Sequence, residues 1–141
     1  MEKEELDVLY DAAILEENRH PYHYEKCPDA DLTIEAYNPL CGDQFKIFLF
    51  TDNEKIHSAF FHGYGCAVSK ASTSVLVREL EGCTLREARQ KCITFQQWLQ
   101  QEGDRPDPIP GPWQPFAAVQ HFPGRLSCAV LAWESLTKDL S

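Results

Sequence analysis

Apolar and polar residues alternate along three segments in the first half of the chain. These segments cover residues 30–37, 44–51 and 55–62, and each has apolar side chains at alternate positions. A period of two is typical of a strand with one face on a hydrophobic core. Asp52-Asn53-Glu54 has the composition of a tight turn between the last two segments. The pattern therefore predicts three strands, and the last two are expected to form an antiparallel hairpin.

The remaining apolar residues recur mostly at helical spacing. The segments predicted as helices are 5–18, 66–81, 84–101 and 123–138, with a short helical turn at 116–121. Thr84 and Glu87 have the spacing of a capping box, which favours a helix start at this point. A chain of 141 residues is long enough for one domain with a substantial core, so we expect a single domain over 1–141.

The segment from Gly103 to Pro115 interrupts this pattern with five prolines and two glycines. Because proline fixes φ and has no amide hydrogen, we expect neither a helix nor an inner strand there. Apolar segments lie on both sides, which favours a Pro-rich surface loop inside the domain at about 103–115. Trp98 and Trp113 are expected to cover the core.

The charge balance argues against a nucleic-acid partner. Thirteen basic and twenty-two acidic residues give a formal net charge of −9, and no cluster of Lys and Arg is present. The first residues are acidic and are not followed by an apolar run, so they do not have the pattern of a secretory signal. No apolar stretch is long enough to span a membrane. We therefore expect a cytoplasmic protein with no membrane partner.

The six cysteines are expected to be reduced in the cytoplasm, and to bind metal, do chemistry or pack in the core. Cys83 and Cys92 fit a position next to a helix cap and a core position. Cys27 lies near His20 and His23, but their spacing is irregular, so we expect a solvated loop instead of a second metal site.

The other three cysteines occur where predicted elements begin or the chain turns. Cys41 and Asp43 lie one residue apart in the turn between the first two strands, and Gly42 between them allows a sharp bend. Cys66 and Cys128 are expected near helix starts, where unpaired N–H groups favour an anion such as a thiolate. Three thiolates and one carboxylate suit a tetrahedral metal site, and zinc accepts this ligand set.

Such a zinc site would carry a net negative charge, because three thiolates and one carboxylate outweigh a divalent ion. Arg125 lies three residues before Cys128 and is expected to offset this charge. A carboxylate ligand makes the site more open to exchange than a fourth thiolate would. Whether His62 or His121 also contributes is left open.

Four stretches of the sequence resemble iron–sulfur cluster assembly proteins of the NifU/IscU type. They are Leu9-Tyr10 to Pro21, Asn38-Pro39-Leu40-Cys41-Gly42-Asp43, Gly63-Tyr64-Gly65-Cys66-Ala67-Val68-Ser69-Lys70-Ala71-Ser72 and Phe122-Pro123-Gly124-Arg125-Leu126-Ser127-Cys128-Ala129-Val130-Leu131-Ala132-Trp133. The resemblance covers nearly the whole chain. It implies an α+β fold of the SufE/NifU-like kind, with a small antiparallel three-stranded sheet, about five helices packed on it and a metal site at one end of the sheet.

Within that family the sequence is most similar to the SufU branch. Scaffold proteins have a histidine before the last cysteine, where this chain has Ser127, and they carry a Leu-Pro-Pro-Val-Lys motif that this chain lacks. The segment between Cys66 and Cys128 is also longer. The resemblance implies a zinc-dependent sulfurtransferase that accepts persulfide sulfur from a SufS-type cysteine desulfurase for downstream cluster-assembly proteins. It implies zinc ligation by Cys41, Asp43, Cys66 and Cys128, with Cys41 as the sulfur acceptor.

Two other functions remain open from the sequence. The same ligands suit a scaffold that assembles a [2Fe–2S] cluster, because thiolates also hold iron–sulfur clusters. Ser127 weighs against this alternative. The second alternative is a non-catalytic interaction module that zinc holds together.

Overall fold

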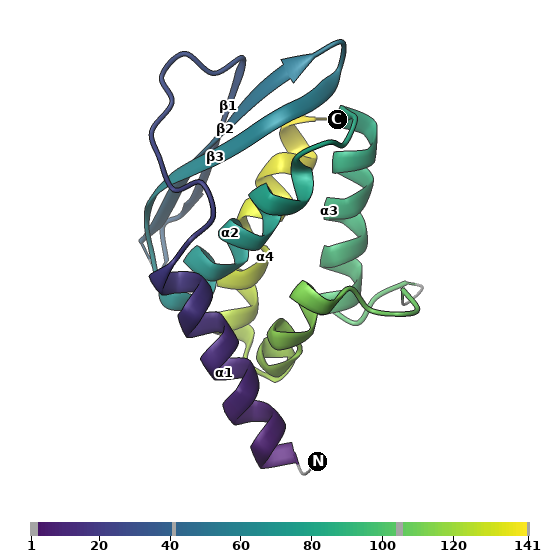
Figure 1. Ribbon diagram of the computed structural model, residues 1–141. Helices are drawn as coiled ribbons and strands as arrows, with labels where there is room; N and C mark the ends of the chain where they lie inside the picture. The colour runs from purple at the N-terminus through teal and green to yellow at the C-terminus, as the bar shows by residue number, and fades with distance from the viewer. Residues whose placement is uncertain (1–2, 41, 104–105, 141) are drawn as a thin grey trace.

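The computed structural model describes residues 3–40, 42–103 and 106–140, which form a three-stranded sheet with helices packed against it (Figure 1). The elements in chain order are α1 (Lys3–Arg19), β1 (Leu32–Asn38), β2 (Asp43–Asp52), β3 (Lys55–Tyr64), α2 (Ala67–Leu80), α3 (Leu85–Leu99), the 3₁₀ helix η1 (Gly111–His121) and α4 (Pro123–Asp139). The α+β fold with an antiparallel three-stranded sheet and about five helices is confirmed. No described helix is long and apolar enough to cross a membrane.

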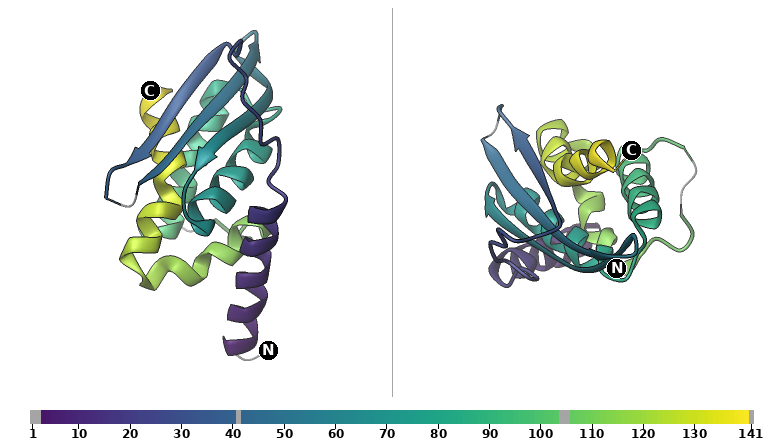
Figure 2. Two further views of the ribbon diagram at one scale, coloured as in Figure 1. Left: turned by 90° about the vertical axis from the view of Figure 1, so that its left-hand side faces the viewer. Right: turned by 90° about the horizontal axis from the view of Figure 1, so that it is seen from above.

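The strands are antiparallel neighbours in the order β1-β2-β3. Ile34, Ile47 and Phe61 lie opposite one another across the sheet, and each is at most 2% exposed. The alternation in the sequence therefore marks the core-facing side correctly. Helix α2 packs against β3 and α4 packs against β1, so both cover this side. Viewed from above, α2, α3 and α4 lie on the same side of the sheet (Figure 2).

The segment that follows α1 covers the outer edge of β3. The amide of Phe61 donates a hydrogen bond to the carbonyl of His23 at 3.1 Å, and the amide of Glu25 donates to the carbonyl of Phe61 at 2.9 Å. Tyr24 thus forms a parallel bridge to Phe61. Cys27, a little further along, is buried, so the prediction that it lies in a solvated loop is wrong for this side chain.

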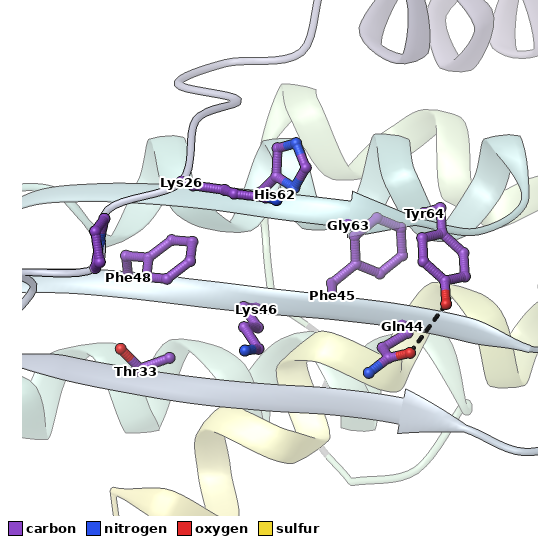
Figure 3. A pocket seen from close by; sticks show the side chains of 10 residues that line it. Lys26, Thr33, Gln44, Phe45, Lys46, Phe48, His62, Gly63 and Tyr64 are labelled. Atoms are coloured by element: carbon purple, nitrogen blue, oxygen red, sulfur yellow. Dashed lines mark hydrogen bonds between the residues drawn. The ribbon is translucent and has the colours of Figure 1, made fainter.

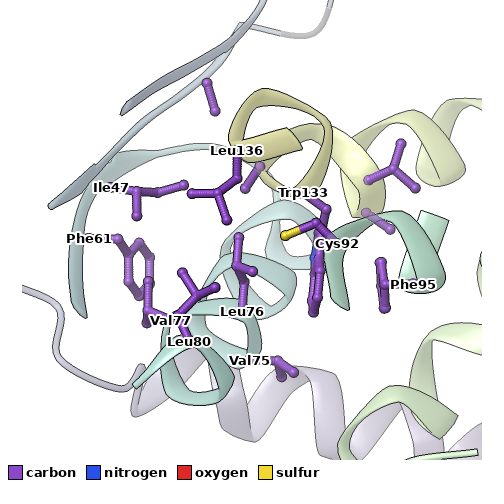
Figure 4. Packing of buried hydrophobic residues seen from close by; sticks show 14 of the residues in the cluster. Ile47, Phe61, Val75, Leu76, Val77, Leu80, Cys92, Phe95, Trp133 and Leu136 are labelled. Carbon is purple, nitrogen blue, oxygen red and sulfur yellow. The ribbon is translucent and has the colours of Figure 1, made fainter. Parts of the chain in front are cut away.

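An aromatic cluster fills the space between α3, η1 and α4. The rings of Phe95 and Trp133 stack with centroids 3.8 Å apart, and Trp113 meets Phe95 edge-on at 5.2 Å. Trp98 and Trp113 are 4% and 3% exposed, which confirms that they cover the core. Cys92 lies in the same core and is fully buried, as expected (Figure 4). Each large side chain buried here contributes about 1.5–3 kcal/mol by its removal from water.

The Pro-rich segment is partly helical, so the prediction that no part of 103–115 forms a helix is wrong. Helix η1 begins at Gly111 and includes Pro112 and Pro115. Pro112 is tolerated because the first turn of a helix does not use its amide hydrogens, and the φ of proline suits 3₁₀ geometry. The indole N–H of Trp113 donates to the carboxylate of Glu79 at 2.6 Å, which ties this segment to α2.

Candidate metal centre

Asp43, Cys66 and Cys128 converge at one end of the sheet, and one ligand atom of each lies within 4.8 Å of the others. Asp43 begins β2, Cys66 caps α2, and Cys128 belongs to α4. In the part of the chain that the structure describes, no other group of three His, Cys, Asp or Glu side chains is close enough to hold a metal ion. Cys41, the fourth predicted ligand and the predicted sulfur acceptor, lies outside the described residues.

The carboxylate of Asp43 is buried and oriented by the main chain of α2. Asp43 is 1% exposed, and its Oδ1 accepts a hydrogen bond from the backbone N–H of Cys66 at 2.9 Å. A buried carboxylate is costly unless it has polar partners, so this bond is part of what makes its position tolerable. It also holds the carboxylate beside the Cys66 sulfur.

Gly65 leaves the space in which this carboxylate lies. A Cβ atom at residue 65 would lie 2.6 Å from Oδ1 of Asp43, 2.6 Å from Oγ of Ser69 and 2.8 Å from the ring of Phe45. All three distances are shorter than real Cβ contacts. The sequence shows Gly65 directly before Cys66, but nothing in the local pattern identifies it as a residue that shapes the site.

Cys66 is placed at the N-terminus of α2, as predicted. Its backbone is extended, with φ −70° and ψ 166°, and its Sγ accepts a hydrogen bond from the amide of Ser69 at 3.4 Å. The Ser69 hydroxyl is buried and donates to the carbonyl of Cys66 at 3.0 Å. Cys66 itself is exposed. Its sulfur therefore has a fixed direction at a helix end that favours negative charge, and it remains open to solvent.

Cys128 does not lie at a helix start, and that prediction is wrong. Helix α4 begins at Pro123, so Cys128 lies in its second turn, beyond the range over which the helix dipole acts strongly. The side chain is buried, with 7% exposed. The hydroxyl of Ser72 donates to the carbonyl of Ala129 at 2.5 Å and accepts from Trp133 Nε1 at 2.8 Å. These bonds fix α4 against α2 next to Cys128.

The cations and histidines near this end have other contacts. The guanidinium of Arg125 lies 5.4 Å from the ring centroid of Phe122, and within the described residues it forms no ion pair. Its role in offsetting charge stays a prediction. His62 stacks on Tyr24, and neither His62 nor His121 belongs to the group of three ligands. Lys70, a cation one turn after the cap of α2, is not among the predicted site residues, and its Nζ lies 4.7 Å from the ring centroid of Tyr24.

Large apolar side chains are exposed close in sequence to the three residues. Leu40 is 96% exposed, Tyr64 67%, Tyr37 59% and Phe122 54%. Exposed apolar residues that gather near a site, in contrast to scattered ones, are typical of surfaces that contact other proteins. The exposed Cys66 lies on a part of the surface that a partner molecule can reach.

The group suits a soft or borderline metal ion. Two thiolates bound to one zinc ion at about 2.3 Å lie about 3.8 Å apart in a tetrahedral site. The described donor atoms, within 4.8 Å of one another, need only small side-chain rotations to reach this geometry. Two sulfurs and one carboxylate oxygen leave one tetrahedral position for a fourth ligand. The same donors suit iron–sulfur ligation, so the geometry alone does not choose the metal.

Comparison with known proteins identifies the family. The model of the NifU-like N terminal domain matches residues 9–109, which is most of the chain. The chain belongs to this family. Its matched segment includes Cys41, Asp43 and Cys66, whereas Cys128 lies beyond it.

Curated relatives extend the similarity beyond this segment. The chain is 28% identical over 137 residues to the zinc-dependent sulfurtransferase SufU of Bacillus subtilis (strain 168), covering 96% of this chain and 92% of that protein. It is 29% identical over 135 residues to the iron–sulfur cluster assembly scaffold protein IscU of Streptococcus pyogenes serotype M1, covering 96% and 84%. Two differently named proteins are thus about equally similar, and the family is that of the SufU and IscU proteins of iron–sulfur cluster assembly.

Solved structures agree with the fold. The crystal structure of FiSufU from the thermophile Fervidobacterium islandicum AW-1, described as an iron–sulfur cluster assembly scaffold protein for the SUF system, superposes with a TM-score of 0.84 at 28% identity. The two chains are covered to 92% and 94%. The N-terminal part of a NifU-like protein from Brucella abortus has a TM-score of 0.77 at 21% identity, and shares the fold.

Proposed function

We propose that the protein is a zinc-dependent sulfurtransferase that accepts persulfide sulfur from a SufS-type cysteine desulfurase for iron–sulfur cluster assembly. The observation that carries the proposal is the convergence of Asp43, Cys66 and Cys128 within 4.8 Å at the end of the sheet. Similarity to a protein named zinc-dependent sulfurtransferase SufU supports it. Cys41 is proposed to complete the ligand set and to accept the sulfur. A reducing compartment such as the cytoplasm would keep these thiols free.

Zinc would keep the thiols that bind it in the thiolate form. The remaining work falls to residues of the chain. The N–H of Cys66 holds the Asp43 carboxylate in place, and Ser69 directs the Cys66 sulfur toward it. A carboxylate would bind zinc less strongly than a fourth thiolate, which would make the ligand set more open to exchange.

The proposed transfer step needs no oxidant or reductant. The thiolate of Cys41 attacks the outer sulfur of the persulfide on the desulfurase. A new S–S bond forms at Cys41, the S–S bond of the donor breaks, and its electron pair stays on the donor cysteine as a thiolate. The neighbouring Leu40 is 96% exposed, which suits a turn that must meet another protein.

The first test is elemental analysis of protein purified without oxygen, together with its visible spectrum. We expect about one zinc per chain, no colour, and stimulation of a SufS-type desulfurase. Cys41→Ala should abolish sulfur acceptance, and sulfur transfer at the full rate by this variant would refute the assigned acceptor. Cys27→Ala provides the matched control, because Cys27 is buried and lies outside the ligand group.

The scaffold alternative is supported by the similarity to an IscU scaffold protein over 96% of this chain and by the similarity to FiSufU, which is also described as a scaffold protein. It predicts a brown protein with iron and acid-labile sulfide in place of zinc. The third possibility, an inert zinc-bound interaction module, predicts tightly held zinc and no effect on a desulfurase. The same two measurements therefore separate the three functions.

We also infer that residues 1–141 form one folding unit. Helix α4 packs on β1, α2 and α3, and so joins the end of the chain to its first strand. A single cooperative transition in chemical unfolding is expected, and two separate transitions would contradict it.

A further inference from the structure

A groove of about 800 Å³ lies on the face of the sheet that the helices leave uncovered. Lys46 on β2 and His62 on β3 point into it, and Lys26 approaches from the loop beside β3 (Figure 3). Phe48 provides apolar floor in the same groove and is only 5% exposed. The groove therefore combines apolar surface with positively charged side chains.

The charge of this groove contrasts with that of the whole chain. The formal net charge is −9, but the residues that line the groove include two lysines and one histidine and no Asp or Glu. The carboxylate of Glu35 on β1 lies 3.7 Å from Nζ of Lys46. Both side chains of this pair are more than half exposed, so the pair is weak and Lys46 is available to another anion.

The shape of the groove favours a polypeptide over a small molecule. Small-ligand sites enclose most of their ligand, whereas Lys46 remains 51% exposed here. Nucleic acid is disfavoured because the described residues that line the groove include only two lysines and one histidine, not the cluster of Lys and Arg on which phosphate binding depends. The two lysines, with no Asp or Glu in the described lining, favour a protein segment that presents acidic side chains.

One end of the groove leads to the candidate metal centre. Gln44 directly follows Asp43, and Tyr64 lies two residues before Cys66. The hydroxyl of Tyr64 donates to the side-chain carbonyl of Gln44 at 3.1 Å across the strands, and both residues line the groove. Tyr64 is 67% exposed. A chain segment in the groove would therefore end beside the three converging ligands, with an exposed tyrosine to contact.

We propose that this groove binds an extended acidic segment, containing aromatic residues, of a partner protein. The lysines attract the carboxylates of the segment, and Phe48 with Tyr64 contacts its rings. Tyrosine and tryptophan carry much of the binding free energy at protein interfaces, which fits the exposed ring of Tyr64. The inference does not depend on which metal the centre holds.

The test uses the complete, metal-loaded protein labelled with ¹⁵N. The probe is a blocked peptide of about eight residues, the length of a strand, with alternating Asp and Tyr. A matched peptide carries Lys in place of Asp. We expect only the acidic peptide to shift the amide signals of Lys46, His62 and Tyr64, and its affinity should fall as salt screens the charges.

The variant Lys26→Gln/Lys46→Gln should weaken the acidic peptide by roughly fivefold. Its matched control is Lys55→Gln/Arg86→Gln, which removes the same charge from exposed positions outside the groove and should bind within about twofold of the parent. Metal content measured on each variant separates this test from the proposed function. The four substitutions all fall on exposed side chains, so the fold is expected to persist.

Three results would overturn the inference. These are equal binding of the two peptides, signal shifts confined to the helical side, or no difference between the two double variants. Reversible self-association that the Lys26→Gln/Lys46→Gln variant alone abolishes would assign the groove to a second copy and would also refute an acidic partner segment.

Discussion

Cysteines at the end of the sheet and cysteines among the helices lie in contrasting surroundings. Cys66 is exposed, and its sulfur accepts a hydrogen bond from the amide of Ser69. Cys92 is fully buried beside the aromatic cluster, and burial raises the pKa of its thiol far above the ordinary value. Cys92 therefore stays protonated and out of reach. The comparison shows that position, not residue type, separates the candidate ligands from the core cysteines.

The two regions also differ in what stabilises them. Hydrogen bonds and a closely packed glycine fix the buried carboxylate at the site, whereas stacked rings of Phe95 and Trp133 fill the core. Substitutions at the site are therefore expected to affect metal binding more than stability. Substitutions in the core are expected to affect stability more than metal binding.

The largest effect should follow from removing a ligand. Cys66→Ser is expected to weaken zinc binding by more than about 100-fold, because a hydroxyl is a much poorer ligand than a thiolate. Even the substitution of residues that only hydrogen-bond to a ligand typically lowers metal affinity by about 10–100-fold. Competition with a chromogenic chelator measures this. Cys92→Ala is the matched control and should keep its zinc while losing stability. Unchanged zinc affinity in Cys66→Ser would remove Cys66 from the ligand set.

Gly65→Ala tests whether close packing around Asp43 matters to the site. The added methyl group would meet the carboxylate and Ser69 at 2.6 Å, so we expect zinc binding to weaken by about 10–100-fold and the free energy of unfolding to fall by about 1–3 kcal/mol. Gly124→Ala adds the same methyl group in open space on α4 and should change little. Chelator competition measures the zinc affinity of both variants, and urea unfolding measures their stability. Equal zinc affinity and equal stability of the two variants would contradict a role for close packing around Asp43.

Phe95→Leu tests whether the aromatic core contributes to stability without affecting the metal site. Loss of the ring that stacks on Trp133 at 3.8 Å should lower the free energy of unfolding by about 2 kcal/mol. Zinc content per folded chain should not change. A variant that loses its metal while keeping its stability would show that the core and the site are not separate in this way.

Ser72→Ala removes a single hydroxyl group at the contact between the two regions, with an expected effect comparable to that of Phe95→Leu. Its hydroxyl links Trp133 Nε1 to the carbonyl of Ala129, and its loss leaves buried polar groups without that partner. We expect a loss of about 1–3 kcal/mol in unfolding free energy, with only a slight decrease in zinc affinity because Cys128 is next to Ala129. Ser135→Ala, on a partly exposed part of α4, is the control.

The smallest effect concerns the pH dependence of stability at Glu79. Burial raises the pKa of this carboxyl above its ordinary value, although the hydrogen bond from Trp113 opposes the shift. The folded state then holds the proton more tightly than the unfolded state, so this group lowers stability as pH rises from the unfolded pKa through the raised folded pKa.

Glu79→Gln removes this titration but keeps an acceptor for Trp113. The stability of the variant relative to the parent should therefore increase as pH rises through that window and level off above it. Urea unfolding between about pH 4 and pH 8 measures the difference. Parallel stability curves for the two proteins would contradict the assignment to Glu79.

Features that depend on nearby residues were predictable from the sequence. Alternation and a turn gave the three strands, and Thr84 with Glu87 forms the predicted capping box at the start of α3. Cys66 was correctly placed at the start of α2, because the residues that define a cap lie within one turn of it.

Features that depend on residues far apart in the sequence could not be predicted from it. The space that Gly65 leaves is defined by Asp43, which lies on a different element, so no local pattern reveals it. The role of Arg125 in offsetting charge remains a prediction, because its guanidinium lies over the ring of Phe122. Prolines in a first turn are compatible with a helix, which is why the start of η1 was missed.

The position of Cys128 in α4 has a consequence for synthesis on the ribosome. Asp43 and Cys66 are translated early, and the strands with α2 can begin to fold while the chain is still nascent. Helix α4 is synthesised after these elements, and it brings both the third member of the candidate ligand group and the apolar surface that packs on β1. A nascent or prematurely terminated chain without α4 lacks both, so Asp43, Cys66 and Cys128 can come together only after α4 has been synthesised.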